Sequence, residues 1–287
     1  MQIKDFYRTG KPVVSFEVFP PKKDADIEGI YQALEEMSGL FPDFISVTYG
    51  AGGAGQDNHT TAVAATITNR YAIASMAHLT CITADKEKIG SMLESMKRQG
   101  VENVLALRGD IPENGDIGAT GEYRYAEDLI RDIRARGDFC IGAACYPEGH
   151  IDCDDTARDL EYLRRKQEAG ADFLISQLFF DNDLYFRFLE KARGAGVTLP
   201  ISAGVMPILD RKQIERMIFL CGASLPSRIV KLLHRYEHNP ADLRRAGIEY
   251  AADQLCGLLD HGVDGVHIYT MNKPGIARRC MQRIGRI

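Results

Sequence analysis

The sequence lacks several features that would point to particular classes of protein. Its 35 Lys and Arg residues and 40 Asp and Glu residues leave a net charge of −5, so a surface for nucleic acid is not expected. Its longest apolar runs have the length of strands, so no membrane span is expected. Residues 1–11 contain no apolar signal core, which predicts a cytoplasmic protein.

Cysteine pairs and short catalytic motifs are missing too. The cysteines number 7, which is odd, and no two of them form a C-x-x-C pair. We therefore expect neither a disulfide framework nor a metal site, and interpret the cysteines as buried reduced thiols. The patterns G-x-x-x-x-G-K-[ST], H-E-x-x-H and G-x-S-x-G are absent, which argues against a P-loop nucleotidase, a zincin and an α/β-hydrolase.

What the sequence does contain is a regular alternation of short apolar runs and segments with helical periodicity. The runs lie at 13–19, 44–49, 75–81, 103–109, 139–146, 173–180, 200–206 and 265–271. Such alternation predicts a parallel sheet, because parallel neighbours need long crossovers. We therefore predict an α/β protein of the (β/α)₈ TIM barrel type, with one domain over residues 1–287. A doubly wound open sheet is the alternative.

One interval between the runs is too long for a single helix. It covers residues 207–264, and Pro226 and the segment His238–Pro240 divide it into about three helices. We therefore expect an extra helical insertion between strands seven and eight.

A glycine-rich segment follows the second run. Gly50, Gly52 and Gly55 have the spacing G-x-G-x-x-G and precede a predicted helix from about Asp57 to Tyr71, which is the context of a dinucleotide-binding fingerprint. That fingerprint usually follows the first strand and needs an acidic residue at the end of the next one, whereas Asp85 is better placed to cap a helix. We favour a loop whose glycines let the backbone pass close to a ligand.

The predicted strand ends are unusually polar, and in a (β/α)₈ barrel the chemistry lies at the carboxyl ends of the strands. The polar residues there are Thr48, Tyr49, His78, Thr80, Arg108, Asp110, Tyr146, Glu148, His150, Gln177, Tyr269, Asn272 and Lys273. Taken singly, each is as readily a solvated or helix-capping residue. His78 on its own is more readily a core histidine than a catalyst.

Glu17 is the most informative of the polar residues. It lies between Phe16 and Val18 and alternates with Ser15 and Phe19, so its side chain faces the same side as theirs. A carboxyl in a barrel mouth is desolvated, which favours its protonated form and suits it to donate a proton near neutral pH. An ion pair with an inward Arg or Lys is an equally acceptable reading.

The helix expected after the fifth run has a mixed face. Asp159, Tyr162 and Lys166 share one side at positions i, i+3 and i+7, and Arg164 and Arg165 complete a basic cluster with Lys166. Spacing alone favours a solvated helix face. The alternative is charge pairing with a ligand that carries phosphate.

Taken together and in order, the strand ends resemble one family. "SFEVFPPK", "VTYGAGG", "HLTC", "LALRGD", "YPEGH", "QLFFD" and "HIYTMN" resemble methylenetetrahydrofolate reductase over nearly the whole chain. The resemblance implies a (β/α)₈ barrel with noncovalent FAD at the strand ends. It implies ping-pong hydride transfer from NADH or NADPH through the flavin to methylenetetrahydrofolate, giving methyltetrahydrofolate for one-carbon and methionine metabolism.

The resemblance also assigns roles by position. Glu17 resembles the general acid, and Asp110 an aspartate beside flavin and pterin. Residues that resemble FAD contacts are Thr48, His78, Leu107, Arg108, Gly109, Asp110, Tyr125, Ala126, Tyr146, His150, Asp159, Arg165, Lys166 and Tyr269. Residues that resemble substrate contacts are Glu17, Gln177, Gln213 and Lys273. No metal ligand is implied.

Three positions depart from the family pattern. Tyr162 stands where a smaller polar residue is common, Met217 where some members have an aromatic, and Lys273 where Arg is common and offers a bidentate grip. Two other functions stay open: a flavin-free lyase or aldolase using Lys273, and a non-catalytic barrel that serves as a subunit of a redox complex. A homo-oligomer or a redox partner subunit is a further expectation.

Overall fold

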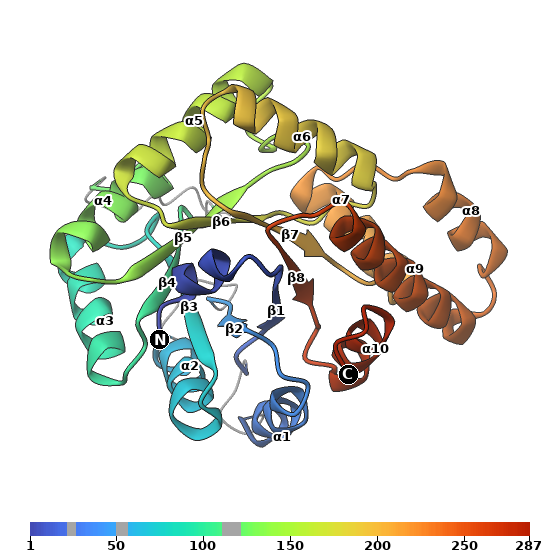
Figure 1. Ribbon diagram of the computed structural model, residues 1–287, viewed down its shortest axis with the longest axis horizontal. Coiled ribbons are helices and arrows are strands. Elements are labelled where there is room, and N and C mark those ends of the chain that lie inside the picture. Colours follow the sequence, from blue (N-terminus) through green and yellow to red (C-terminus); the bar gives the residue numbers. More distant parts are fainter. Residues whose placement is uncertain (22–26, 50–56, 111–121) are drawn as a thin grey trace.

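The eight strands form a closed parallel barrel. The structure is a computed structural model that describes residues 1–21, 27–49, 57–110 and 122–287. The strands are β1 (Val13–Val18), β2 (Phe44–Val47), β3 (Ala74–Thr80), β4 (Asn103–Leu107), β5 (Cys140–Cys145), β6 (Phe173–Ser176), β7 (Ile201–Val205) and β8 (Gly265–Tyr269). Each pairs with the next, and β8 pairs with β1 (Figure 1). The predicted (β/α)₈ barrel is confirmed, and the alternative of an open sheet is wrong.

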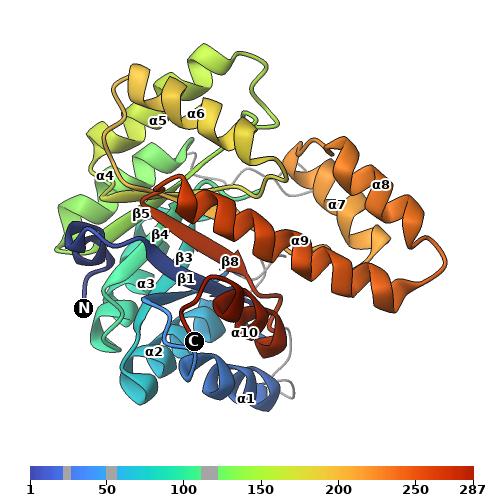
Figure 2. The same ribbon diagram turned by 45° about the vertical axis from the view of Figure 1, so that its right-hand side comes forward.

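Helices surround this barrel. They are α1 (Ile27–Ser38), α2 (Asp57–Tyr71), α3 (Lys86–Arg98), α4 (Ala126–Arg136), α5 (Thr156–Ala169), α6 (Asn182–Gly194), α7 (Arg211–Cys221), α8 (Ser227–Arg235), α9 (Pro240–Asp260) and α10 (Pro274–Arg283), with a 3₁₀ helix η1 at Ile3–Thr9. The helices α7, α8 and α9 lie between β7 and β8, which confirms the predicted insertion. The helix α9 packs against β7 and β8, while α7 and α8 project away from the barrel (Figure 2).

Local sequence signals set the ends of these helices. Asp85 caps α3 by accepting a hydrogen bond from the Lys88 backbone N–H at 2.7 Å, as predicted. Pro226 precedes α8 and Pro240 begins α9, because proline at the first turn sacrifices no helical hydrogen bond. The insertion is tied back to the barrel where the Ser224 backbone N–H donates to the Glu148 carboxylate at 3.0 Å.

Two glycines in the strands make room for aromatic rings. A Cβ on Gly142 in β5 would lie 2.8 Å from the Phe173 ring, and one on Gly204 in β7 would lie 2.7 Å from the Tyr269 hydroxyl. Because a real side chain never approaches so closely, only glycine lets Phe173 fill the barrel and Tyr269 lie across its mouth.

The cysteines are less uniformly buried than predicted. All seven cysteines are free: Cys81, Cys140, Cys145 and Cys280 are buried, and Cys153, Cys221 and Cys256 are partly buried. Within the described ranges, no helix has both the length and the apolarity to span a bilayer. Gly50, Gly52 and Gly55 of the glycine loop lie outside the described residues.

Candidate active site

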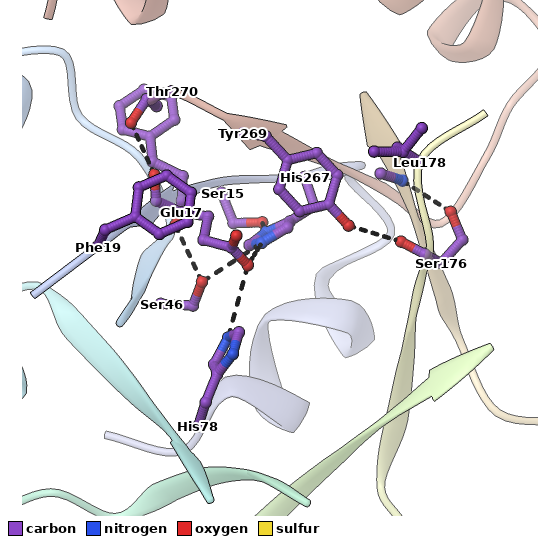
Figure 3. Close-up of polar contacts among 12 residues, drawn as sticks. Ser15, Glu17, Phe19, Ser46, His78, Ser176, Leu178, His267, Tyr269 and Thr270 are labelled. Atoms are coloured by element: carbon purple, nitrogen blue, oxygen red, sulfur yellow. Dashed lines mark hydrogen bonds and ion pairs between the residues drawn. The ribbon is translucent and has the colours of Figure 1, made fainter. Parts of the chain in front are cut away.

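The predicted acid lies inside the barrel mouth between two histidines. Glu17 in β1 is 7% exposed, and its Oε2 lies 3.4 Å from Nε2 of His267 in β8 and 3.5 Å from Nε2 of His78 in β3 (Figure 3). The inward orientation expected from the alternation in β1 is therefore correct. The ionisable groups that meet the carboxyl are imidazoles rather than the Arg or Lys of the alternative interpretation.

His267 is held from both ring nitrogens. Its Nδ1 lies 2.7 Å from the Ser15 hydroxyl, and its Nε2 lies 3.3 Å from the Ser46 hydroxyl (Figure 3). The Ser15 hydroxyl has one hydrogen and lies 3.2 Å from the Val266 carbonyl. When Ser15 donates to Val266, it accepts from Nδ1–H of His267, which leaves the Nε2 lone pair facing Glu17. This arrangement accepts a hydrogen bond from a protonated Glu17.

His78 completes the pair around the carboxyl. Burial lowers the pKa of His78 to about 4, although the neighbouring Glu17 carboxylate acts in the opposite direction. The ring is therefore neutral near pH 7. Its Nε2 is buried and has no hydrogen-bond partner within the described part of the chain. It faces the Glu17 carboxylate at 3.5 Å, so the two side chains are close neighbours without a well-formed hydrogen bond.

Tyr269 closes the opposite side of the mouth. Its hydroxyl donates to the Ser176 carbonyl at 2.9 Å (Figure 3), and burial raises the pKa of the Tyr269 hydroxyl well above its ordinary value. The chain after it is fastened to β1, since the Thr270 hydroxyl donates to the Glu17 carbonyl at 2.6 Å. The backbone of the acid is thus fixed by the strand on either side of it.

A cleft of about 480 Å³ lies beside the mouth, between the amino-terminal halves of α4 and α5. Eight predicted cofactor residues line it: Leu107, Arg108, Tyr125, Ala126, Tyr146, His150, Asp159 and Lys166. The face of α5 that carries Asp159, Tyr162 and Lys166 therefore borders a cavity rather than bulk solvent.

The cleft is lined by three cationic side chains, Arg108, Arg158 and Lys166, and by five carboxylates, of Glu127, Asp152, Asp154, Asp155 and Asp159. Lys166 Nζ donates to the Ala144 carbonyl at 2.8 Å and lies 5.4 Å from the centre of the Tyr146 ring. Burial lowers the pKa of Lys166, and Asp159 opposes that shift. Arg108 Nη2 donates to the Asp152 carboxylate at 2.8 Å, and this hydrogen bond lowers the pKa of Asp152. Arg108 and Lys166 therefore lie among carboxylates, and the cleft has a mixed charge.

The turn after β4 explains how Arg108 reaches this position. Gly109 has φ +88°, and a Cβ there would lie 3.0 Å from the Thr80 side chain. Glycine is needed both for the left-handed backbone and for the close approach to β3. The Asp152 backbone N–H donates to His150 Nδ1 at 3.1 Å, so His150 is neutral, in line with a pKa that burial and Arg108 lower.

Six predicted cofactor residues do not line the cleft: His78 and Tyr269, which lie in the mouth, and Thr48, Gly109, Asp110 and Arg165. Thr48 is half-buried, and its carbonyl accepts from the Thr60 hydroxyl at 3.0 Å. Asp110 is exposed at the edge of a described range. Burial and the charge of Asp110 raise the pKa of Cys221 to about 11. Arg165 pairs with the buried carboxylate of Glu127. Gly109 has no side chain, and its φ of +88° shapes the turn after β4.

Three of the predicted substrate residues, Gln177, Gln213 and Lys273, differ from one another in their surroundings. Gln177 Oε1 accepts from the Leu178 backbone N–H at 2.9 Å, and Gln213 Oε1 accepts from the Leu209 backbone N–H at 2.7 Å. The Gln213 Nε2, in α7 of the insertion, is buried and has no hydrogen-bond partner among the described residues. Lys273 is exposed at the start of α10.

Sequence reasoning missed the residues that hold these groups. Ser46 and His267 point into the barrel at inward positions of β2 and β8, so strand alternation was a usable signal for both. Asp152 and Glu127 carried no such signal, because each meets its arginine from a different βα unit. In the described ranges, no group of three or more His, Cys, Asp or Glu side chains is arranged to bind a metal ion.

A closed parallel barrel with a polar mouth and a charged cleft at its strand ends has the architecture of the (β/α)₈ barrel enzymes. The family described as methylenetetrahydrofolate reductase matches residues 2–285. The chain therefore belongs to the methylenetetrahydrofolate reductase family.

Individual relatives agree with this family. The chain is 36% identical over 291 residues to methylenetetrahydrofolate reductase (NADH) 1 of Zea mays, an alignment that covers 97% of this chain and 49% of the maize protein. It is 31% identical over 276 residues to 5,10-methylenetetrahydrofolate reductase of Pectobacterium carotovorum subsp. carotovorum, covering 96% of this chain and 91% of the bacterial protein. The chain thus spans about half the length of its plant relatives and nearly all of its bacterial one.

A solved structure shares the fold. It is an uncharacterized protein from Clostridium thermocellum that binds two copies of 5-methyl-5,6,7,8-tetrahydrofolic acid. It superposes with a TM-score of 0.68 over 99% of this chain and 98% of that chain, at 14% sequence identity.

Proposed function

We propose that the protein is an FAD-dependent reductase that converts 5,10-methylenetetrahydrofolate to 5-methyltetrahydrofolate with a reduced nicotinamide as hydride donor. The observation that carries this proposal is the Glu17 carboxyl, buried between His78 and His267 at a barrel mouth that adjoins a cleft lined by charged side chains. Membership of the family supports it. So does the binding of methyltetrahydrofolate by the structural neighbour from Clostridium thermocellum.

FAD fits the residues of the site. Arg108 and Lys166 offer positive charge to a pyrophosphate, and Tyr125 offers an aromatic surface in the same cleft. The volume of about 480 Å³ lies in the range of small-molecule sites. The His78 ring lies farther in, beside Glu17. When bound, FAD would supply a carrier that accepts and returns a hydride.

Glu17 would act on the folate. Methylenetetrahydrofolate carries its one-carbon unit in a five-membered ring between two nitrogens, and protonation of one nitrogen opens that ring to a reactive iminium. The Glu17 carboxyl is 7% exposed and faces the rings of His78 and His267, so it would be placed inside the mouth to donate that proton. The His267 ring, fixed by Ser15, keeps the Glu17 oxygen in place for the transfer.

The remaining polar groups would position the substrates. Gln213 presents an unpartnered Nε2, and Tyr269 presents a neutral ring that lies across the mouth. Closing the site against water would keep the iminium from hydrolysis before hydride arrives. NADH is the first donor to test, because the maize relative bears NADH in its name. Comparison of the rates of flavin reduction by NADH, by NADPH and by a protein donor would show which of them is the donor.

The substitution Glu17→Gln separates the two halves of the reaction. We expect flavin reduction by NADH to proceed at the wild-type rate, because that step needs no proton from Glu17. We expect reoxidation of the reduced flavin by methylenetetrahydrofolate to slow by about 10²–10⁴-fold. Anaerobic stopped-flow absorbance of the flavin measures both steps. Glu36→Gln on the exposed face of α1 is the matched control and should leave both rates unchanged.

Three outcomes would contradict the proposal at different levels. Equal slowing of both steps would show that Glu17 is not the acid. Purified protein that takes up no flavin when incubated with FAD would exclude flavin dependence and favour a lyase. A protein that binds FAD but turns over no folate with any nicotinamide would be a non-catalytic subunit.

A further inference from the structure

The side chain of Asn272 ties the loop after β8 to the end of β1. Its Oδ1 accepts from the Phe19 backbone N–H at 2.8 Å, and its Nδ2 donates to the Phe19 carbonyl at 2.9 Å. The last residue pair in the register of β1 with β8 is Glu17 with Tyr269. Phe19 lies beyond that pair, so the amide group of Asn272 continues the attachment of β1 to β8 past the acid.

The end of β1 has few backbone groups that can hold it. The two prolines at 20–21 have no N–H, so the N–H of Phe19 is the last backbone donor before them. Asn272 supplies a partner for both backbone groups of Phe19. Two residues earlier, the Thr270 hydroxyl donates to the Glu17 carbonyl at 2.6 Å (Figure 3). The loop after β8 therefore holds the backbone of the acid and the residue that closes the strand.

The turn that presents Asn272 is strained. The Lys273 backbone N–H donates to the Thr270 carbonyl at 3.0 Å, and the two central residues, Met271 and Asn272, have φ of +56° and +54°. These are the φ values of a type I′ turn, which favours Asn and Gly at its centre. Asn272 suits such a turn, whereas a left-handed backbone is costly for Met271. Strain of this kind persists where the surrounding structure holds the chain in place, and it gathers at functional sites.

The Glu17 carboxyl depends on its backbone for its position. Its Oε2 lies 3.4 Å from Nε2 of His267 and 3.5 Å from Nε2 of His78. Both distances exceed the usual hydrogen-bond range of about 2.7–3.2 Å, so the two rings hold the carboxyl only loosely. The path of β1 must therefore set where the carboxyl lies. A displacement of about 1 Å at a reacting group can slow a reaction by about 10²-fold.

We propose that Asn272 is a positioning residue for the acid. By holding both backbone groups of Phe19, it fixes the end of β1 and so keeps the Glu17 carboxyl at the place from which it protonates the folate. The inference rests on the proposed function for the role of Glu17. The attachment itself rests on the two hydrogen bonds and on the turn that presents Asn272 to β1.

The substitution Asn272→Gly removes both hydrogen bonds and keeps the turn, because glycine adopts a positive φ freely. Anaerobic stopped-flow absorbance of the full chain, reconstituted with FAD, measures its effect. We expect flavin reduction by NADH at the wild-type rate, and reoxidation by methylenetetrahydrofolate slowed by about 10–100-fold. Met271→Gly, in the same turn, keeps the Asn272 side chain and is the matched control that should leave both rates unchanged. Asn272→Asp keeps only the acceptor for the Phe19 N–H, so its reoxidation rate should fall between those of the wild type and Asn272→Gly.

A double variant tests whether Asn272 acts through Glu17. In the Glu17→Gln protein, Asn272→Gly should slow reoxidation no further, because the group that it positions is already gone. A general structural defect would instead add its own slowing to that of Glu17→Gln. If Asn272→Gly does not fold, the same comparison is made with Asn272→Asp.

The outcomes separate this inference from the proposed function. Unchanged reoxidation in Asn272→Gly, equal slowing of both steps, or additive slowing in the double variant would each overturn the positioning role and leave the proposed function standing. Wild-type protein whose reduced flavin is not reoxidised by methylenetetrahydrofolate would refute the proposed function, and the inference with it.

Discussion

At the scale of single residues, His78 is a group whose protonation opposes folding. Its pKa is about 4 in the folded protein, because burial disfavours the imidazolium more than the Glu17 carboxylate favours it, against about 6.5 for a histidine in an unfolded chain. Between pH 6.5 and pH 4, His78 is therefore protonated in the unfolded state but stays neutral in the folded state. Stability is fully present above pH 6.5 and falls as the pH drops toward 4.

The substitution His78→Gln tests this linkage. We expect the wild-type free energy of unfolding to lose about 3 kcal/mol between pH 7 and pH 4 through His78 alone, and the variant to lack that part of the slope. Urea denaturation at closely spaced pH values measures it. His238→Gln, in the exposed turn after α8, should keep the wild-type slope. An unaltered slope in His78→Gln would show that His78 takes up its proton normally.

At the scale of secondary-structure elements, the mouth is shaped by the contact between β6, β7 and β8. Gly204 in β7 faces the Ser176 carbonyl and the Tyr269 hydroxyl, and a Cβ there would lie 2.4 Å and 2.7 Å from those atoms. The carbonyl belongs to a paired strand and cannot move away cheaply. A side chain at Gly204 must therefore displace the Tyr269 ring and part the strands.

Gly204→Ala should consequently lower the free energy of unfolding by about 1–3 kcal/mol. Urea denaturation provides the measurement, and the fluorescence of bound flavin reports whether the mouth has changed shape. Gly29→Ala is the control, since no atom lies within 4 Å of its Cβ position on the exposed face of α1, where alanine should stabilise by up to about 1 kcal/mol. A neutral Gly204→Ala would mean that the strands adjust without cost.

The elements themselves were readable from the sequence to a large extent. The apolar runs, Pro226 and the segment His238–Pro240 predict the barrel and its insertion, because strand burial and proline act locally. The strand predicted from the run at 173–180 is too long, because β6 ends at Ser176. Phe179 and Phe180 are buried in the loop that follows, and an apolar run does not distinguish a buried loop from a strand.

The sequence predicts the site only where the residues concerned are close together along the chain. Alternation in β1 predicts that Glu17 faces inward, and helical spacing predicts the shared face of Asp159, Tyr162 and Lys166. The partner of Arg108 is 44 positions away and that of Arg165 is 38 positions away. No local pattern encodes such pairings, because barrel closure alone brings those βα units together.

At the scale of the whole molecule, the two ends of the barrel have different tasks. The acid, the histidines and the cleft lie at the carboxyl ends of the strands. The amino ends are closed by η1: the Ile3 backbone N–H donates to the Asn103 side chain at 2.8 Å, and the Tyr7 hydroxyl lies 2.8 Å from the Ser202 hydroxyl. Figure 1 shows this segment near the barrel axis. Stability and chemistry should therefore be separable by mutation.

Ile3→Ala tests that separation. Ile3 is 0% exposed and belongs to the same core cluster as Val13, Phe44 and Phe173. Its truncation should therefore cost about 2–4 kcal/mol of unfolding free energy. The kcat of the folded fraction should stay at the wild-type value, because the groups that hold Glu17 and His267 in place belong to strands: Ser15, Ser46 and His78. Urea denaturation and turnover at a temperature well below the transition measure the two quantities. Ile287→Ala, with a side chain 46% exposed, should change stability by less than about 0.5 kcal/mol. A fall in kcat for Ile3→Ala, measured on fully folded protein, would show that the two ends of the barrel are coupled, and that packing at the amino ends sets the position of Glu17.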